Sequence, residues 1–158
     1  MPFSREITEY DQYLFGQGEH YELYEKLGAH VTEKNGEAGV YFAVWAPRAL
    51  TVRLIGDFNS WEGNAHGMKR KEPLGIFDLF VPGLASGAVY QYEIITQDGQ
   101  TLRKADPFAS GAQLRPGTAS VVRDIMNLKW TDSVWMKKRR SFNVDTDPMV
   151  IYECHPGS

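Results

Sequence analysis

The chain has 158 residues, of which 42% are hydrophobic and 13% aromatic, which is enough for one domain with a buried core. Its formal net charge of -3 gives no basic footprint, so we do not expect nucleic acid as a partner. No apolar run approaches the ~20 residues of a membrane span, no signal-peptide pattern is visible, and the single Cys154 excludes an internal disulfide framework, so we expect a cytoplasmic protein that binds no membrane.

The first part of the chain, residues 1–29, is predicted to be a polar lead with short helical pieces. Leu23 and Leu27 are four residues apart and therefore share one helix face. Gly28 is expected to be the residue that follows the helix end. We expect this lead to cap the domain that follows it.

Residues 30–124 carry the alternation and the turn signals of short antiparallel strands. Asn35-Gly36 is the strongest short hairpin signal, and in the strand after it Val40, Phe42 and Val44 share one face. The predicted strands run over His30–Glu33, Gly39–Trp45, Thr51–Ile55, Gly75–Val81, Val89–Thr96, Thr101–Lys104 and Ala119–Arg123. About seven short strands at near-regular spacing predict an all-β, immunoglobulin-like β-sandwich.

A polar turn follows the third of these strands and ends at a tryptophan. Asp57 and Asn59 supply turn chemistry, and Trp61 follows while the chain is still close to the turn, so a flat apolar ring is expected near the surface beside short polar groups. This combination suits a sugar ring, which offers C–H groups to an aromatic face and hydroxyls to Asn or Asp. The alternative is that Trp61 is a core or rim aromatic, and the residues alone favour that alternative.

The last part of the chain differs in kind from the sandwich. Residues 125–147 are charged, contain tryptophan and show no sustained periodicity, which predicts a linker that docks its tryptophans on a neighbouring domain. Residues 148–158 contain a short apolar run at Met149–Tyr152, typical of a strand that is covered on both faces in a parallel sheet.

The titratable residues give no catalytic or metal site. The four histidines show no metal-ligand spacing, and Cys154 has no identifiable base beside it. Asp106, which precedes Pro107, is interpreted as a turn former rather than an acid catalyst. We therefore expect no cofactor, no metal and no catalytic residue in this chain.

Several motifs resemble one known family. The stretch VYFAVWAPRALTV, followed by GDFNSW, is similar to the glucan-binding β-sandwich of α-amylase-superfamily branching and debranching enzymes and of glycogen-sensing kinase subunits. The segments YLFGQGEHYELYEKLGAH, ADPFA, RPGTASVV and MVIYECHPGS extend the resemblance to 1,4-α-glucan (glycogen) branching enzymes over nearly the whole chain.

This resemblance implies a noncatalytic N-terminal module that binds α-glucans such as glycogen and malto-oligosaccharides. In the family a pair of carboxyl groups transfers an α-1,4-glucan segment to a 6-hydroxyl through a glycosyl-enzyme intermediate. The resemblance places those carboxyl groups on later strands of a catalytic (β/α) barrel, and residues 148–158 at the start of that barrel, truncated here. The chain is then expected to be inactive by itself, with the missing catalytic barrel as its partner.

The resemblance also implies a carbohydrate-binding site. Trp61 matches the aromatic platform of the family, and Asn59 and Asp57 match its polar neighbours. These three residues, together with Lys104, are the predicted carbohydrate-binding residues.

Two residues of the glycogen-sensing relatives have no counterpart in this chain. Those relatives carry a lysine where Glu93 stands here, and a second tryptophan where Thr101 or Leu102 stands. Lys104 and Tyr92 are candidate substitutes, although Tyr92 is equally compatible with a place in the core. The resemblance thus implies a module that docks and positions glucan with weak affinity.

Three alternatives remain at this point. The chain is a free-standing glycogen-binding adaptor, or the module of a debranching or trehalose-releasing relative, or a sandwich that binds only protein. The IYECHPGS ending argues against the adaptor, and the lead together with the same ending favours branching over debranching or trehalose release.

Overall fold

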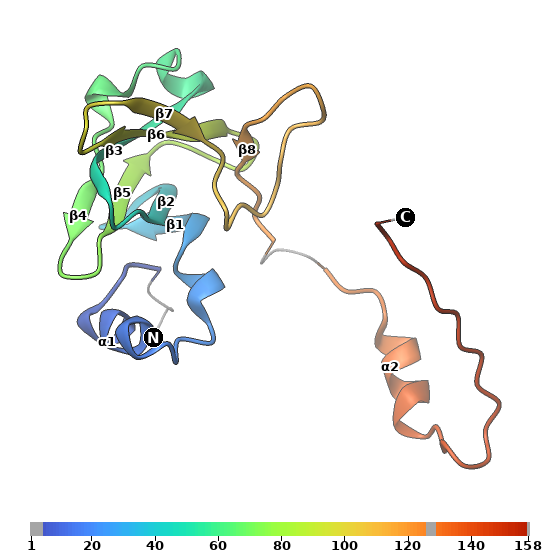
Figure 1. The fold of residues 1–158 in the computed structure, drawn as a ribbon. Coiled ribbons are helices and arrows are strands. Elements are labelled where there is room, and N and C mark those ends of the chain that lie inside the picture. The colour runs from blue at the N-terminus through green and yellow to red at the C-terminus, as the bar shows by residue number, and fades with distance from the viewer. Residues whose placement is uncertain (1–4, 126–128, 158) are drawn as a thin grey trace. The chain divides into compact units, whose positions relative to one another are not determined.

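The strands form two antiparallel sheets that pack face to face. In the computed structural model, which describes residues 5–125 and 129–157, the chain divides into two units after Ile125. The sheets have the strand orders β1-β2-β5-β4 and β3-β6-β7, and β8 also pairs with β6 (Figure 1). The strands are β1 (Gly28–Lys34), β2 (Glu37–Trp45), β3 (Ala49–Gly56), β4 (Lys69–Lys71), β5 (Ile76–Pro82), β6 (Val89–Thr96), β7 (Thr101–Lys104) and β8 (Ser120–Val121).

The core between the sheets is built from the alternating residues of the predicted strands. Val40, Phe42 and Val44 of β2 point into it, and the rings of Phe42 and Tyr90 meet edge to face with centroids 5.0 Å apart. Its buried members are Ala29, Val40, Phe42, Val44, Ala49, Val52, Leu54, Met68, Phe77, Val81, Tyr90, Tyr92 and Val122. The predicted all-β sandwich is confirmed.

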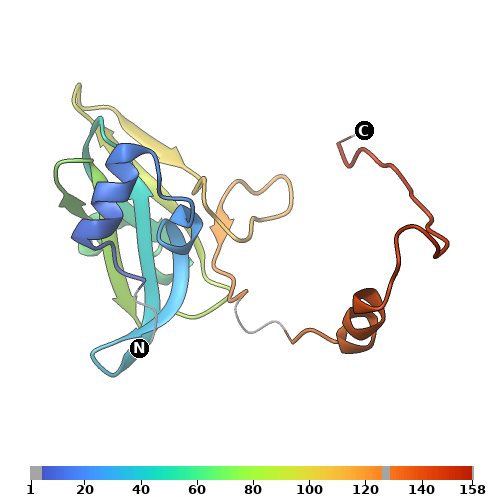
Figure 2. The same ribbon diagram turned by 90° about the horizontal axis from the view of Figure 1, so that it is seen from below.

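The other face of the first sheet is also buried, because the N-terminal lead covers it. Tyr41, Ala43 and Ile76 point to this side and pack with Ile7 and Leu27 of the lead. The lead contains α1 (Glu9–Gln17) and the 3-10 helix η1 (Leu23–Glu25), and Figure 2 shows α1 lying over β2. The sheet therefore has apolar residues on both faces of β2.

The lead is tied together by a buried charge network centred on Asp11, which is 7% exposed. One carboxylate oxygen accepts hydrogen bonds from the backbone N–H of Thr8 at 2.8 Å and its hydroxyl at 2.6 Å, and lies 3.0 Å from Lys26 Nζ. The other oxygen lies 2.9 Å from His20 Nε2. Burial alone would raise the pKa of Asp11, but the hydrogen bonds from Thr8, His20 and Lys26 outweigh it and lower this pKa to about 2.

A second buried carboxylate fixes the loop between β7 and β8. Asp106 Oδ2 accepts hydrogen bonds from the hydroxyls of Tyr90 at 2.7 Å and Tyr92 at 3.0 Å, and Oδ1 accepts one from the Phe108 N–H at 2.8 Å. Burial raises the pKa of Asp106, and these hydrogen bonds oppose the shift. The predicted turn at Asp106 is confirmed, and the same carboxylate also anchors the turn to the core.

Two local predictions need correction. Gly28 does not follow a helix end but is the first residue of β1, and the glycine that ends a helix is Gly18, after α1. The strand β4, at Lys69–Lys71, was not predicted because three charged residues on a sheet edge carry no hydrophobic alternation. The Asn35-Gly36 hairpin is confirmed: the two residues have φ values of 54° and 82°, as a type I′ turn requires.

The second unit holds a helix that the sequence analysis did not predict. The predicted linker contains α2 (Ser133–Arg140), whose last turn carries four basic residues, which interact favourably with the helix dipole. Met149–Tyr152 is exposed, and none of the described residues pairs with it as a neighbouring strand. That this segment begins a catalytic barrel stays a prediction. Residues 126–128 and 158 of these predicted segments, and 1–4 of the lead, lie outside the described residues.

The Asp11 network predicts an acid-sensitive component of stability. A carboxylate with a pKa of about 2 in the folded state and 3.8 otherwise contributes stability above about pH 4 that is lost as the pH falls through about 2. This difference in pKa between the folded and unfolded states corresponds to about 2 kcal/mol of folding free energy. We expect the free energy of unfolding in urea to fall by this amount between pH 4 and pH 2 in the wild type, and not in Asp11→Asn.

Glu19→Gln, which alters an exposed carboxyl group of the same lead, is the matched control and should keep the wild-type pH dependence. Equal pH dependence in Asp11→Asn and the wild type would contradict this account of Asp11.

Candidate functional site

Three of the four predicted carbohydrate-binding residues, Asp57, Asn59 and Trp61, lie in a strained turn at the end of β3. The turn comprises the 3-10 helix η2 (Asp57–Asn59) and then Ser60 and Trp61, whose φ values are 53° and 63°. A left-handed conformation costs a residue other than glycine about 1–2 kcal/mol. Two such residues in sequence persist only where the surroundings hold them, and such strain is concentrated at functional sites. We call residues 56–61 the Trp61 turn.

Asn59 is the residue that holds the Trp61 turn. Its side-chain oxygen accepts a hydrogen bond from the Gly56 N–H at 2.9 Å. Its Nδ2 donates to the Leu54 carbonyl oxygen at 3.0 Å and lies 3.1 Å from His66 Nδ1. Both hydrogens of the amide are thus used inside the protein, and in this conformation Asn59 has none left for a sugar hydroxyl. In the structure Asn59 therefore holds the Trp61 turn together, and its part in sugar binding stays a prediction.

Packing and hydrogen bonding also explain the first two residues of the Trp61 turn, Gly56 and Asp57. A Cβ atom at Gly56 would lie 2.2 Å from the carbonyl oxygen of Val89, so only glycine allows β3 and β6 to approach here. Asp57 is exposed, and its carboxylate accepts a hydrogen bond of 3.3 Å from the Val89 N–H. Trp61 itself is half-buried. An aromatic face and a carboxylate are therefore both presented at this turn.

Lys104 is an exposed residue of β7, the edge strand of the second sheet. It pairs with Tyr92, which points into the core, and residues directly opposite each other share a face. Tyr92 is 1% exposed, so the structure makes it a core residue and not a substitute sugar ligand. The outward face carries Glu93, which lies 3.4 Å from Arg53 and 3.6 Å from Arg103.

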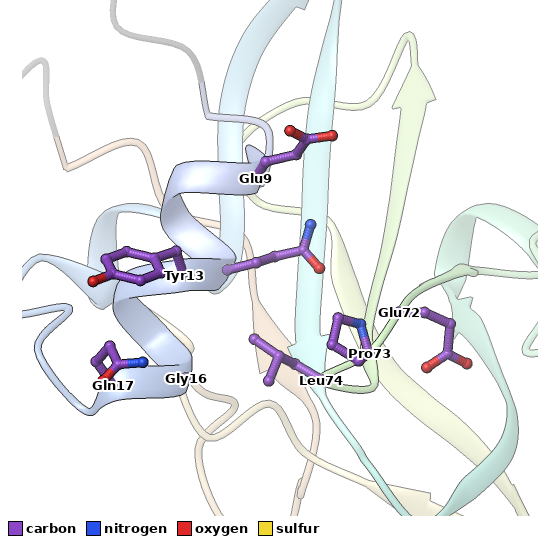
Figure 3. A pocket seen from close by; sticks show the side chains of 8 residues that line it. Glu9, Tyr13, Gly16, Gln17, Glu72, Pro73 and Leu74 are labelled. Atoms are coloured by element: carbon purple, nitrogen blue, oxygen red, sulfur yellow. The ribbon is translucent and has the colours of Figure 1, made fainter.

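A groove that the sequence analysis missed lies on the outer side of the first sheet. It has a volume of about 370 Å³ and is lined by α1 on one side and the turn between β4 and β5 on the other (Figure 3). Its lining residues are Glu9, Gln12, Tyr13, Gly16, Gln17, Glu72, Pro73 and Leu74. We call it the α1 groove. Its size falls in the range of small-molecule sites.

The α1 groove offers several hydrogen-bond acceptors and an aromatic ring at its rim. The Gln12 side-chain oxygen is buried and accepts no hydrogen bond from the described residues. Glu9 and Glu72 add carboxylates, Glu72 being held 2.6 Å from Arg70 Nε, and the Tyr13 ring is 61% exposed. A ligand with many hydroxyl donors and apolar C–H faces fits such a surface.

The sequence contains one indication of this groove, namely that its α1 residues are spaced as one face of a helix. Positions 9, 12, 13, 16 and 17 follow the i, i+3, i+4, i+7, i+8 pattern of one helix face. Because this face is polar, sequence reasoning interprets it as solvent-exposed. The other wall of the groove comes from the β4–β5 turn, more than fifty residues later, and no local pattern connects the two.

Comparisons with known proteins agree with a carbohydrate-binding module. Residues 26–109 match the family model described as carbohydrate-binding module 48 (isoamylase N-terminal domain). The chain is 52% identical over 152 residues to the 1,4-α-glucan branching enzyme GlgB of Butyrivibrio fibrisolvens, covering 96% of this chain and 24% of that enzyme. It is 47% identical over 155 residues to the GlgB of Trichodesmium erythraeum, covering 98% of this chain and 20% of that enzyme.

A solved structure with the same fold is PulA from Klebsiella pneumoniae in complex with maltotriose. It superposes with a TM-score of 0.50 and 28% sequence identity, covering 62% of this chain and 11% of that chain. The chain thus spans about a fifth to a quarter of the length of the curated relatives it matches.

The hydrogen bonds of Asn59 predict that its loss disorders the Trp61 turn. In Asn59→Ala the Gly56 N–H and the Leu54 carbonyl oxygen lose their partner, and we expect the free energy of unfolding to fall by about 2 kcal/mol. The indole emission of Trp61, measured with the other three tryptophans replaced by Phe, should shift to longer wavelength as its ring becomes more exposed.

Asn64→Ala is the matched control, since Asn64 is an exposed asparagine in the next 3-10 helix, η3 (Gly63–Ala65). If Asn59→Ala and Asn64→Ala behave alike, Asn59 does not hold the turn.

Proposed function

The chain belongs to the carbohydrate-binding module 48 (isoamylase N-terminal domain) family, and we propose that it is the noncatalytic module that binds and positions α-glucan for a 1,4-α-glucan branching enzyme. The observation that carries the proposal is the Trp61 turn, in which two left-handed residues end at a half-buried tryptophan and which also holds the exposed carboxylate of Asp57. The identity of about half over nearly the whole chain to two branching enzymes supports the choice of enzyme.

We assign the sugar contacts at the Trp61 turn to Trp61 and Asp57. The indole face packs on the C–H face of a glucose unit, and the Asp57 carboxylate accepts a hydrogen bond from a hydroxyl group. Asn59 contributes by holding the turn. Lys104, which lies on β7, is not assigned to this contact and stays a prediction.

We propose the α1 groove as a second glucan contact. Its buried Gln12 oxygen lacks a partner among the described residues, and burying an acceptor without a hydrogen bond is unfavourable, so a ligand hydroxyl would satisfy it. The Tyr13 ring at its rim can stack on a sugar. The maltotriose-bound PulA, with the same fold, supports an α-glucan as the ligand class.

We further propose that the second unit docks on the catalytic barrel of a full-length enzyme. Its large apolar side chains are unusually exposed, with Val150 at 95%, Tyr152 at 88% and Trp130 at 76%. Exposed apolar surface on this scale is typical of a protein interface. The adaptor alternative offers no reason for such a segment. The unpaired Cys154 supports a reducing, cytoplasmic compartment.

The two contacts predict separable losses of binding. We expect the wild-type chain to bind maltoheptaose with a Kd on the order of 1 mM, which is ~4 kcal/mol. Losing the contact of one aromatic face costs about 1 kcal/mol, so Trp61→Ala and Tyr13→Ala should each raise the Kd roughly fivefold. Isothermal titration calorimetry measures both.

Trp130→Ala, which removes an exposed tryptophan of the second unit, is the control and should bind like the wild type. A folded Trp61→Ala variant with wild-type affinity would refute the platform assignment, and a folded Tyr13→Ala variant with wild-type affinity would refute the groove assignment.

The chain alone should make no branches. The proposed catalytic carboxyl groups belong to a barrel outside these residues, so purified protein mixed with amylose should yield no new α-1,6 linkages, as counted by isoamylase digestion. A reproducible increase over a buffer control would place the chemistry in this module.

A further inference from the structure

The helix that forms one wall of the α1 groove is held by a buried charge as well as by apolar contact. Asp11 is the one buried residue among the nine of α1. In the second half of the helix, Phe15 packs against the buried apolar cluster beneath the lead, and its ring meets the half-exposed Trp45 ring with centroids 5.5 Å apart. Apolar packing is non-directional, so these contacts alone leave the rotation of α1 about its axis weakly defined.

The hydrogen bonds and ion pairs of the Asp11 carboxylate define the rotation of α1, which apolar packing leaves weakly defined. The carboxylate connects Thr8, which precedes α1, with His20, which follows it, and with Lys26, which precedes β1. Lys26 is itself 6% exposed and donates to the Glu6 carbonyl oxygen at 3.1 Å. Three stretches of the lead, before α1, after α1 and before β1, therefore meet at the Asp11 side chain, and each contact has a preferred geometry.

Gln12 and Tyr13, which line the groove, directly follow Asp11 in the same helical turn. A rotation of α1 that withdraws Asp11 from Lys26 also displaces these two side chains relative to the Pro73–Leu74 wall. We infer that Asp11 is a positioning residue for glucan binding in the α1 groove, acting through Lys26 and His20 and not by contact with the sugar. This inference rests on the proposed glucan contact in that groove.

The test must separate positioning from stability, because a buried charge without its partner destabilises a fold. The double variant Asp11→Asn/Lys26→Met removes both charges, and an ion pair replaced by groups of similar size is often close to neutral in stability. We therefore expect its melting temperature to lie near that of the parent chain, while the lead loses the contact that sets the rotation of α1.

Binding is measured in a Trp61→Ala background of the whole 158-residue chain, so that the groove is the remaining contact. Titration with maltoheptaose should show a Kd at least fivefold higher for Asp11→Asn/Lys26→Met than for its parent. In a Gln12→Ala/Tyr13→Ala background with Trp61 intact, the same double variant should leave the Kd unchanged, which a general loss of structure would not do. Glu22→Gln, at an exposed carboxyl of the lead, is the control.

A Kd within twofold of the parent in the folded double variant would overturn the positioning role while leaving the groove assignment intact. No binding by the Trp61→Ala parent itself would overturn the groove assignment, and this inference with it. If the double variant does not fold, Thr8→Ala decides, since it removes the hydroxyl that donates to Asp11 and leaves both charges. It should raise the Kd at least twofold, and an unchanged Kd in folded Thr8→Ala would overturn the inference.

Discussion

The strand β2 is buried on both faces, and the arrangement of the first unit follows from that constraint. Along β2, Phe42 points into the core between the sheets, while Tyr41 and Ala43 point the other way and are just as buried. An outer sheet of a sandwich usually presents polar residues to water on its outward face. Here an apolar outward face has to be covered, and the N-terminal lead is the segment that covers it.

The lead covers this face with polar anchors as well as apolar side chains. Tyr41 lies beneath it, donates a hydrogen bond to Asp78 at 2.7 Å and accepts one from the Ile7 N–H at 3.1 Å. Asp11 and Lys26 form the second anchor, at 3.0 Å. Buried ion pairs add little net stability, and in some proteins they determine which of several packings is adopted. Their place in this lead is consistent with such a role, because the helix they hold forms one wall of a groove.

The sequence predicted the parts of the fold that depend on local pattern. Alternation located β2, β5 and β6, and the Asn35-Gly36 turn located the first hairpin. It missed β4, whose edge position demands no alternation, and it missed the α1 groove, whose walls come from distant segments. Trp61 is predicted as a sugar contact by resemblance and stays a prediction. The hydrogen bonds of Asn59 were not predicted, because its partners, Leu54 and His66, are identified only in three dimensions.

The two candidate sugar contacts are built in the same way. In each, a polar side chain that is hydrogen-bonded inside the protein precedes by two residues the aromatic ring offered to the ligand: Asn59 precedes Trp61, and Asp11 precedes Tyr13. An aromatic ring supplies contact area, but area has no preferred direction. Hydrogen bonds do have one, so the buried polar residue determines where the ring points. A sugar ring stacks only on a ring held at the right angle, and weak binding surfaces of this kind therefore depend on residues that never touch the ligand.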